Sequence, residues 1–265
     1  MHFADKLARG RKTSGSRLCV GLDPFVERFA ARFTAQPRPI LAFNRYIVDL
    51  VGDLACAFKP QAAHHAAHGA ERDLADTIAY IREKARHAVV ILDAKRGDIG
   101  STATLYAREA FDRYDADAVT VNPYMGDDSV LPFLDRSDHG AVVLCRTSNP
   151  DAGRFQDATI DGDRVFVAVA RRAETAWNAN GNVMLVVGAT KIDDMAAVRA
   201  AAPSLPFLVP GIGEQGGEPS EVLRIGRRAD GEGLVVSASR SILYAGSDDA
   251  IRDAAIDAHR ALTAS

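Results

Sequence analysis

Cysteine is scarce in this sequence, and the few residues present are far apart. Cys19, Cys56 and Cys145 each lie within an apolar run of the 265-residue chain. Disulfide frameworks and structural zinc sites require cysteines that are clustered or paired at short spacings. The sequence therefore argues against both, and we expect three buried free thiols.

Two other features are missing: an excess of charge of one sign and a long apolar segment. Lysine and arginine number 32 against 35 aspartate and glutamate residues, for a net charge of -3, so no nucleic acid polymer is expected as a partner. No apolar run approaches the roughly 20 residues that a membrane-spanning helix needs, and residues 1–16 lack the apolar core of a secretory signal. We therefore expect a cytoplasmic protein with no membrane contact.

What the sequence does contain is an alternation of strand-length apolar runs and segments of helical periodicity. The helical segments include residues 71–87, 163–181 and 247–262. The apolar runs are nearly continuous, as in parallel strands that are buried on both faces. There are eight of them: residues 18–22, 54–58, 88–92, 118–121, 141–145, 183–187, 207–209 and 234–236.

About eight β/α units in a chain of this length are typical of a (β/α)8 TIM barrel, an α/β fold. An open doubly wound sheet is the alternative, but the first β/α turn reads GLDPFVERF and lacks the G-x-G-x-x-G pattern of a dinucleotide-binding fold. No linker rich in proline, glycine or serine divides the chain. We therefore predict that residues 1–265 form a single barrel domain.

Polar residues directly follow most of the predicted strands. In a barrel, the carboxyl ends of all strands meet at one mouth, where the active sites of this fold lie. The sequence thus predicts a catalytic face formed by Asp23, Lys59, Asp93, Lys95, Asn122, residues 146–149 and Arg240.

The stretch DAKRGD, residues 93–98, concentrates charge at the end of the third strand. Asp93 and Lys95 are two residues apart and should point to the same face of a strand, with Asp98 in the loop beyond. A structural ion pair that closes the barrel end would explain this stretch alone. Asp23 and Lys59 should join it at the mouth, however, and an alternating set of carboxylates and ammonium groups indicates more than one ion pair.

Such a cluster suits acid catalysis on an anionic substrate. An ammonium among carboxylates is stabilised in its charged form, so Lys95 should be protonated at neutral pH and able to donate a proton; a Schiff-base lysine requires the opposite environment. A substrate carboxylate held about 4 Å from Asp93 would be repelled by about 4 kcal/mol at an effective dielectric constant of about 20. Loss of CO2 would relieve this repulsion, provided that a remote part of the substrate binds tightly enough to hold it there.

Residues 209–219, VPGIGEQGGEP, follow the seventh strand and contain four glycines. Their backbone N–H groups can approach an anion closely, although a plain flexible loop would have the same composition. Arg240 follows the eighth strand, and the loops after strands seven and eight are the usual phosphate site of this barrel. A guanidinium binds phosphate through paired hydrogen bonds. Together with Gln215, these features predict a small phosphorylated substrate and a loop that closes over it.

These motifs resemble the orotidine 5'-phosphate decarboxylase family. The resemblance runs from Gly21 to about Gly246 and rests on GLDP, FKP, DAKRGDIGST, TSNP, PGIGEQGG and SRSI, each at the end of a predicted strand. The stretch FKPQAAHHAAHGAERDL is similar to the extended second β/α segment of a bacterial subgroup. The resemblance implies a carboxy-lyase of pyrimidine biosynthesis that converts orotidine 5'-monophosphate to UMP, the last de novo step, without a metal or organic cofactor.

The resemblance also implies roles for individual residues. Lys95 would protonate C6 of the pyrimidine as the carboxylate departs, with Asp93 lying against that carboxylate. Asp23 and Lys59 would bind ribose hydroxyls and order the charged groups. Ser148, in the TSNP motif, would contact the edge of the pyrimidine.

Further implied roles concern the phosphate and a second subunit. Gln215 and Arg240 would bind the phosphate. Family members are homodimers with shared active sites, so Asp98, together with Ile99 and Thr102, would enter the site of the neighbouring subunit. The catalytic unit would then need two chains.

Two other hypotheses fit part of this pattern. A magnesium-dependent sugar-phosphate decarboxylase or synthase of the same barrel superfamily also uses D-x-K-x-x-D, and metal dependence would distinguish it. A nucleotide-binding or regulatory barrel would need the anion site but not the charged cluster.

Three histidines close together in the sequence suggest a metal site, because His64 and His68 are four residues apart, with His65 between them. No third ligand is identifiable, however, and we expect surface or interface histidines.

Overall fold

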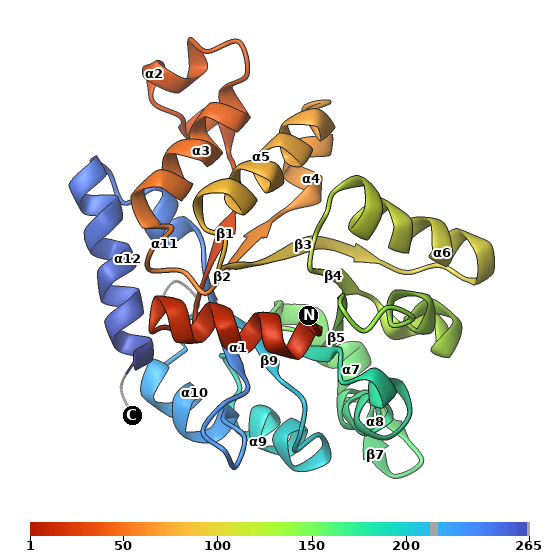
Figure 1. Ribbon diagram of the computed structural model, residues 1–265. Coiled ribbons are helices and arrows are strands. Elements are labelled where there is room, and N and C mark those ends of the chain that lie inside the picture. The colour runs from red at the N-terminus through yellow and green to blue at the C-terminus, as the bar shows by residue number, and fades with distance from the viewer. Residues whose placement is uncertain (213–216, 264–265) are drawn as a thin grey trace.

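The computed structural model describes residues 1–212 and 217–263, and at its centre lies a closed barrel of parallel strands (Figure 1). The strand order around the barrel is β1-β10-β9-β8-β5-β4-β3-β2. This confirms the predicted (β/α)8 TIM barrel. The barrel strands are β1 (Leu18–Leu22), β2 (Ala57–Pro60), β3 (Val89–Arg96), β4 (Ala118–Val121), β5 (Gly140–Arg146), β8 (Val183–Val187), β9 (Phe207–Pro210) and β10 (Leu234–Ala238).

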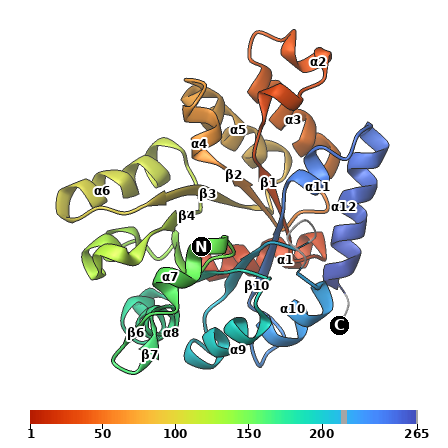
Figure 2. The same cartoon turned by 180° about the vertical axis from the view of Figure 1, so that it is seen from behind.

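Helices surround the barrel, and views from its two ends show them as a ring outside the strands (Figures 1 and 2). In the described part of the chain, none of them is long and apolar enough to cross a membrane. The helices are α1 (Phe3–Ser14), α2 (Ala31–Thr34), α3 (Pro39–Val51), α4 (Ala62–Ala66), α5 (Glu71–Lys84), α6 (Gly100–Arg108), α7 (Gly153–Gln156), α8 (Val165–Arg172), α9 (Ile192–Ala201), α10 (Pro219–Gly226), α11 (Arg240–Leu243) and α12 (Asp248–Thr263).

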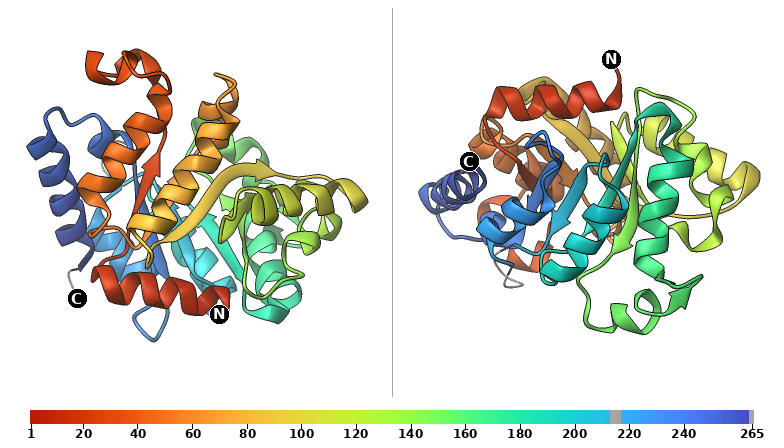
Figure 3. Two further views of the ribbon diagram at one scale, coloured as in Figure 1. Left: turned by 45° about the horizontal axis from the view of Figure 1, so that its top comes forward. Right: turned by 90° about the horizontal axis from the view of Figure 1, so that it is seen from below.

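Helix α1 precedes the first strand and lies across the amino-terminal end of the barrel (Figure 3). Phe3 is buried and packs so closely on Gly140 that a Cβ atom there would lie 2.5 Å from its ring. Lys6 donates a hydrogen bond of 2.9 Å to the buried carboxylate of Asp117. Because this end is covered, the opposite end of the barrel, where the strands terminate, is the end left for a ligand.

The apolar core has two parts, one inside the barrel and a larger one between the strands and the helices. Cys19 and Cys56 belong to the inner part and Cys145 to the outer part. All three thiols are free and buried, as predicted. Burial raises the pKa of Cys19 to about 12, so this thiol stays protonated and unreactive at neutral pH.

Three elements of the structure differ from the predicted ones. Strand β3 continues past the apolar run 88–92 to Arg96, because Arg96 still pairs with Val121 of β4 and Asp93 pairs with Gln61, which follows β2. The short hairpin β6 (Thr159–Ile160) and β7 (Asp163–Arg164) has no apolar run to reveal it. The helical segment 163–181 begins only at Val165 and becomes a π-helical turn at Ala173–Trp177.

Candidate active site

A cavity of about 1040 Å³ opens at the carboxyl ends of the strands. Residues from all eight barrel strands, or from the loops directly after them, reach it. The predicted catalytic face is therefore present as one space, except that Arg146 is buried behind the wall and does not line it. Of the predicted site residues, the cavity is lined by Asp23, Lys59, Asp93, Lys95, Ser148 and Arg240.

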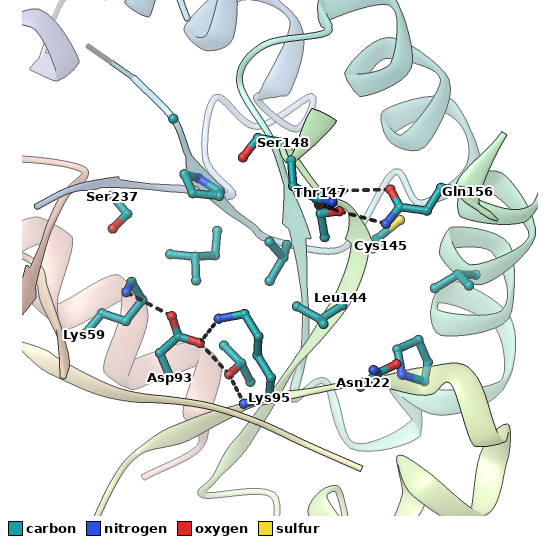
Figure 4. A pocket seen from close by; sticks show the side chains of 18 of the residues that line it. Lys59, Asp93, Lys95, Asn122, Leu144, Cys145, Thr147, Ser148, Gln156 and Ser237 are labelled. Carbon is teal, nitrogen blue, oxygen red and sulfur yellow. Dashed lines mark hydrogen bonds and ion pairs between the residues drawn. The ribbon is translucent and has the colours of Figure 1, made fainter. Parts of the chain in front are cut away.

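The carboxylate of Asp93 accepts four hydrogen bonds at the floor of this cavity. Its Oδ1 atom accepts from Lys95 Nζ at 2.6 Å and from Thr120 Oγ1 at 2.9 Å. Its Oδ2 atom accepts from Lys59 Nζ at 3.1 Å and from Gln61 Nε2 at 3.0 Å. Figure 4 shows Lys59 and Lys95 approaching this carboxylate from two sides. Asp93 is thus the centre of the charged cluster, and its orientation is fixed from four directions.

The second carboxylate of the cluster belongs to Asp23, whose Oδ1 atom lies 3.7 Å from Lys59 Nζ. Burial alone would lower the pKa of Lys59, but the carboxylates of Asp23 and Asp93 outweigh burial and raise it. Burial would likewise raise the pKa of Asp93, but Lys59 and Lys95 lower it to about 2. In both cases the charged partners outweigh burial, so Lys59 and Asp93 stay charged at neutral pH.

The two lysines differ in how far the cavity exposes them. The side chain of Lys59 is 9% exposed, whereas that of Lys95 is 50% exposed. An ion pair that served only to close the barrel end would bury both lysines, whereas the ammonium of Lys95 is open to the cavity. Lys95 is therefore the more accessible of the two lysines to a ligand in the cavity.

Asp93 and Lys95 do meet in the cavity, but the strand alternation from which this was predicted is not the reason. Lys95 has a φ angle of 46°, and the pairing of β3 with β4 shifts register between Leu92 and Arg96. Regular alternation therefore does not extend through this part of β3. The side chains come together because the backbone bulges.

The loop after β5 carries Ser148 at the wall of the cavity (Figure 4). The preceding residue, Thr147, is held by the Gln156 side chain, which accepts from its backbone N–H at 3.0 Å and donates to its Oγ1 atom at 2.8 Å. Gln156 in turn accepts a hydrogen bond of 3.3 Å from the buried guanidinium of Arg146. Arg146 is fixed by Asp194, to which its Nε atom donates at 2.8 Å.

The predicted phosphate residues are only partly within the described structure. Arg240 is the first residue of α11 and lines the cavity. The adjoining wall includes Pro210, Gly211 and Ile212 at the end of β9. Gln215 falls within residues 213–216, which lie outside the described residues.

Asp98, Ile99 and Thr102 lie at the start of α6 and do not line the cavity of their own chain. Asp98 accepts a hydrogen bond of 2.8 Å from the backbone N–H of Ile99. The Ile99 side chain is 54% exposed. These residues are therefore separate from the cluster around Asp93 within one chain.

The expectation of surface or interface histidines is wrong for one of the three. His65 is fully buried, with Nδ1 bonded to the carbonyl of Gln61 at 2.9 Å and Nε2 3.2 Å from the Asn44 amide. His64 contacts the carbonyl of Pro24 through Nδ1 at 3.1 Å, and His68 is exposed. Within residues 1–212 and 217–263, no group of three His, Cys, Asp or Glu side chains is placed to hold a metal ion.

Two residues that bind Asp93, namely Thr120 and Gln61, were not predicted from the sequence. A signal for each was present. Thr120 is the one polar residue of the buried strand AVTV, and buried polar groups usually have a bonding partner. Gln61 directly follows the FKP motif that places Lys59.

A family model described as "Orotidine 5'-phosphate decarboxylase / HUMPS family" matches residues 16–254. The chain belongs to this family. The matched range contains all of the cavity residues named above, so the family's region and the site coincide.

Individual relatives within the orotidine 5'-phosphate decarboxylase family match nearly the whole chain. The chain is 49% identical to the orotidine 5'-phosphate decarboxylase of Cellvibrio japonicus over 257 residues, which cover 96% of this chain and 94% of the relative. It is 51% identical to the protein of that name from Ralstonia nicotianae over 255 residues, with coverage of 96% and 94%. The structure of Leishmania donovani OMP decarboxylase matches with a TM-score of 0.87 and 39% identity, covering 99% of this chain and 97% of that one.

These relatives bear on the alternative hypotheses. Each of the matches just described carries the decarboxylase name. The comparisons therefore do not favour a magnesium-dependent sugar-phosphate decarboxylase or synthase. They also do not favour a barrel that only binds nucleotides.

Proposed function

We propose that this chain decarboxylates orotidine 5'-monophosphate to UMP in the last step of de novo pyrimidine synthesis, with no metal ion or organic cofactor. The observation that carries the proposal is the placement of a half-exposed ammonium, Lys95, beside the fixed carboxylate of Asp93 in a cavity that also contains Arg240. The substrate carries a carboxylate at C6 of the pyrimidine and a phosphate at the other end. Its phosphate would bind at Arg240, and its carboxylate would lie beside Asp93 within reach of Lys95.

In the proposed reaction, the substrate carboxylate lies against Asp93. The bond between C6 and the carboxylate breaks, CO2 leaves, and the electron pair stays on C6. Lys95 then transfers a proton from Nζ to C6, which gives UMP, and the neutral amine regains a proton from solvent. The half-exposed side chain of Lys95 suits this exchange.

The other predicted residues would hold the substrate in this position. Asp23 and Lys59 would bind the ribose hydroxyls, and Ser148 would contact the pyrimidine edge. Arg240 and Gln215 would bind the phosphate. Binding energy from the phosphate would offset the repulsion between the substrate carboxylate and Asp93, which is about 4 kcal/mol for charges about 4 Å apart at an effective dielectric constant of about 20.

We further propose a cytoplasmic homodimer in which Asp98, Ile99 and Thr102 enter the partner's cavity. All three residues lie outside the cavity of their own chain, with Ile99 and Thr102 exposed and Asp98 partly exposed, and this placement supports the arrangement. So does a set of large apolar side chains on α6 and the nearby turns that are 43% to 74% exposed: Leu105, Tyr124, Met125 and Leu131. Apolar patches of this kind commonly mark protein interfaces. The three free thiols suit a reducing compartment.

The direct test is turnover of orotidine 5'-monophosphate by the purified protein in EDTA, followed through the pyrimidine absorbance. We expect turnover that EDTA does not reduce and that orotidine, which lacks the phosphate, supports far less well. Absence of turnover with or without added magnesium would contradict the proposal. Turnover of this substrate that requires magnesium would contradict the metal-free part of the proposal.

A further inference from the structure

Strand β3 is irregular at the point where it carries the proposed proton donor. Between two consecutive registered contacts, β3 advances four residues, from Leu92 to Arg96, while β4 advances two, from Val119 to Val121. Three residues of β3, namely 93–95, therefore lie opposite the single residue Thr120 of β4. Bulges of this kind redirect side chains and are common next to active sites.

Two backbone N–H groups of the bulge donate to a side chain on the neighbouring strand, the hydroxyl of Thr120. Its Oγ1 atom accepts from the N–H of Ala94 at 3.0 Å and from the N–H of Lys95 at 2.8 Å. The same hydroxyl donates to Asp93 Oδ1 at 2.9 Å. A hydroxyl offers one donor and two acceptor positions, so Thr120 uses its full hydrogen-bonding capacity on this bulge.

Lys95 needs such support because of its backbone conformation. Its φ angle of 46° lies in the left-handed region, which residues other than glycine rarely adopt. Strained backbone of this kind persists only when neighbouring groups hold it. Thr120 is buried, with 2% exposure, so water does not readily replace its hydroxyl.

We propose that Thr120 is a positioning residue that sets where the ammonium of Lys95 lies relative to Asp93. One oxygen atom fixes the backbone of Lys95 and, at the same time, the carboxylate oxygen that receives the Lys95 ammonium at 2.6 Å. From one position on β4, Thr120 therefore fixes both the backbone of Lys95 and the carboxylate that binds its ammonium. The inference rests on the proposed decarboxylation and assigns Thr120 no contact with the substrate.

The test compares two substitutions that separate the hydroxyl from the methyl group. Thr120→Val keeps the shape and removes the hydroxyl, whereas Thr120→Ser keeps the hydroxyl and removes the methyl. We expect Thr120→Val to lower kcat about 100-fold, because displacements of about 1 Å have effects of this size, with KM and the Kd of UMP changed by no more than about threefold. Thr120→Ser should retain kcat within about fivefold of the wild type.

Two results would overturn the proposal: equal kcat values for Thr120→Val and Thr120→Ser, or parallel losses of kcat and UMP affinity in Thr120→Val. If Thr120 had a purely structural role, kcat would not depend on the presence of the hydroxyl while KM and UMP affinity stay nearly unchanged. If Thr120→Val fails to fold, Thr120→Ala takes its place in the same comparison, with the same expected order. Failure of the wild type to turn over orotidine 5'-monophosphate would instead count against the proposed function.

Discussion

Lys59 and Asp93 form an ion pair of 3.1 Å in which the two side chains are only 9% and 10% exposed. In such a buried pair, loss of one charge leaves the other uncompensated and destabilises the native state. The pKa of Asp93, at about 2 in the folded protein, lies below the ordinary value of an aspartate, which is about 3.9. Protonation of Asp93 is therefore coupled to unfolding.

The sign of this coupling follows from the lowered pKa. The unfolded chain binds a proton at Asp93 at a higher pH than the native state does, so the stabilisation is complete above about pH 4 and is lost as the pH falls toward 2. We expect Asp93 to contribute about 2 kcal/mol to the loss of unfolding free energy across this range. Lys59 contributes nothing there, because its pKa is raised and lies far above this range.

Urea denaturation at several pH values between about 4 and 2 measures this contribution when Asp93→Asn is compared with the wild type. The wild type should lose about 2 kcal/mol more than the variant as the pH falls. Equal losses in the two proteins would show that Asp93 does not have the proposed electrostatic environment.

Gln156 gives a second prediction, because it fixes Thr147 through two hydrogen bonds. Gln156→Leu should free the loop that carries Ser148 and weaken UMP binding about tenfold, the effect expected for loss of about 1.4 kcal/mol. Arg154→Ala is the matched control, because Arg154 lies on the same short helix, α7, with its side chain 87% exposed. Titration calorimetry with UMP should detect the difference, and equal affinities of the two variants would be the contrary result.

Shared active sites predict that two inactive variants rescue each other. Lys95→Ala and Asp98→Ala chains should each be nearly inactive alone. Random mixing makes about half of the dimers mixed, and each mixed dimer has one intact site of two, so activity should recover to about a quarter of the wild-type level. Mass spectrometry can verify that subunits have exchanged. Mixtures that exchange subunits but stay inactive would mean that Asp98 does not act across an interface.

The barrel was predictable because its strands are buried on both faces. Runs such as 18–22 and 183–187 are continuously apolar and match β1 and β8 residue for residue. Helix α1 and the hairpin β6–β7 were not predicted, because each depends on contacts far along the chain or on exposed polar residues. Local periodicity carries no signal for such elements.

The residues of the candidate site were predictable in part, but their geometry was not. The ends of the strands identified Asp93, Lys95 and Arg240 as neighbours of one cavity. The bulge in β3 could not be foreseen, because it lies in the pairing of β3 with another strand, β4, where the hydroxyl of Thr120 bonds its backbone. A bulge is an irregularity in the pairing of two strands, so the pattern within one strand does not reveal it.

The most direct measurement of the central claim is the effect of Lys95→Ala on turnover and on UMP binding in the same preparation. If Lys95 donates the proton, kcat should fall by more than about 1000-fold while the Kd of UMP changes by less than about tenfold. If UMP affinity collapses with kcat, or if turnover survives the substitution, Lys95 is not the proton donor.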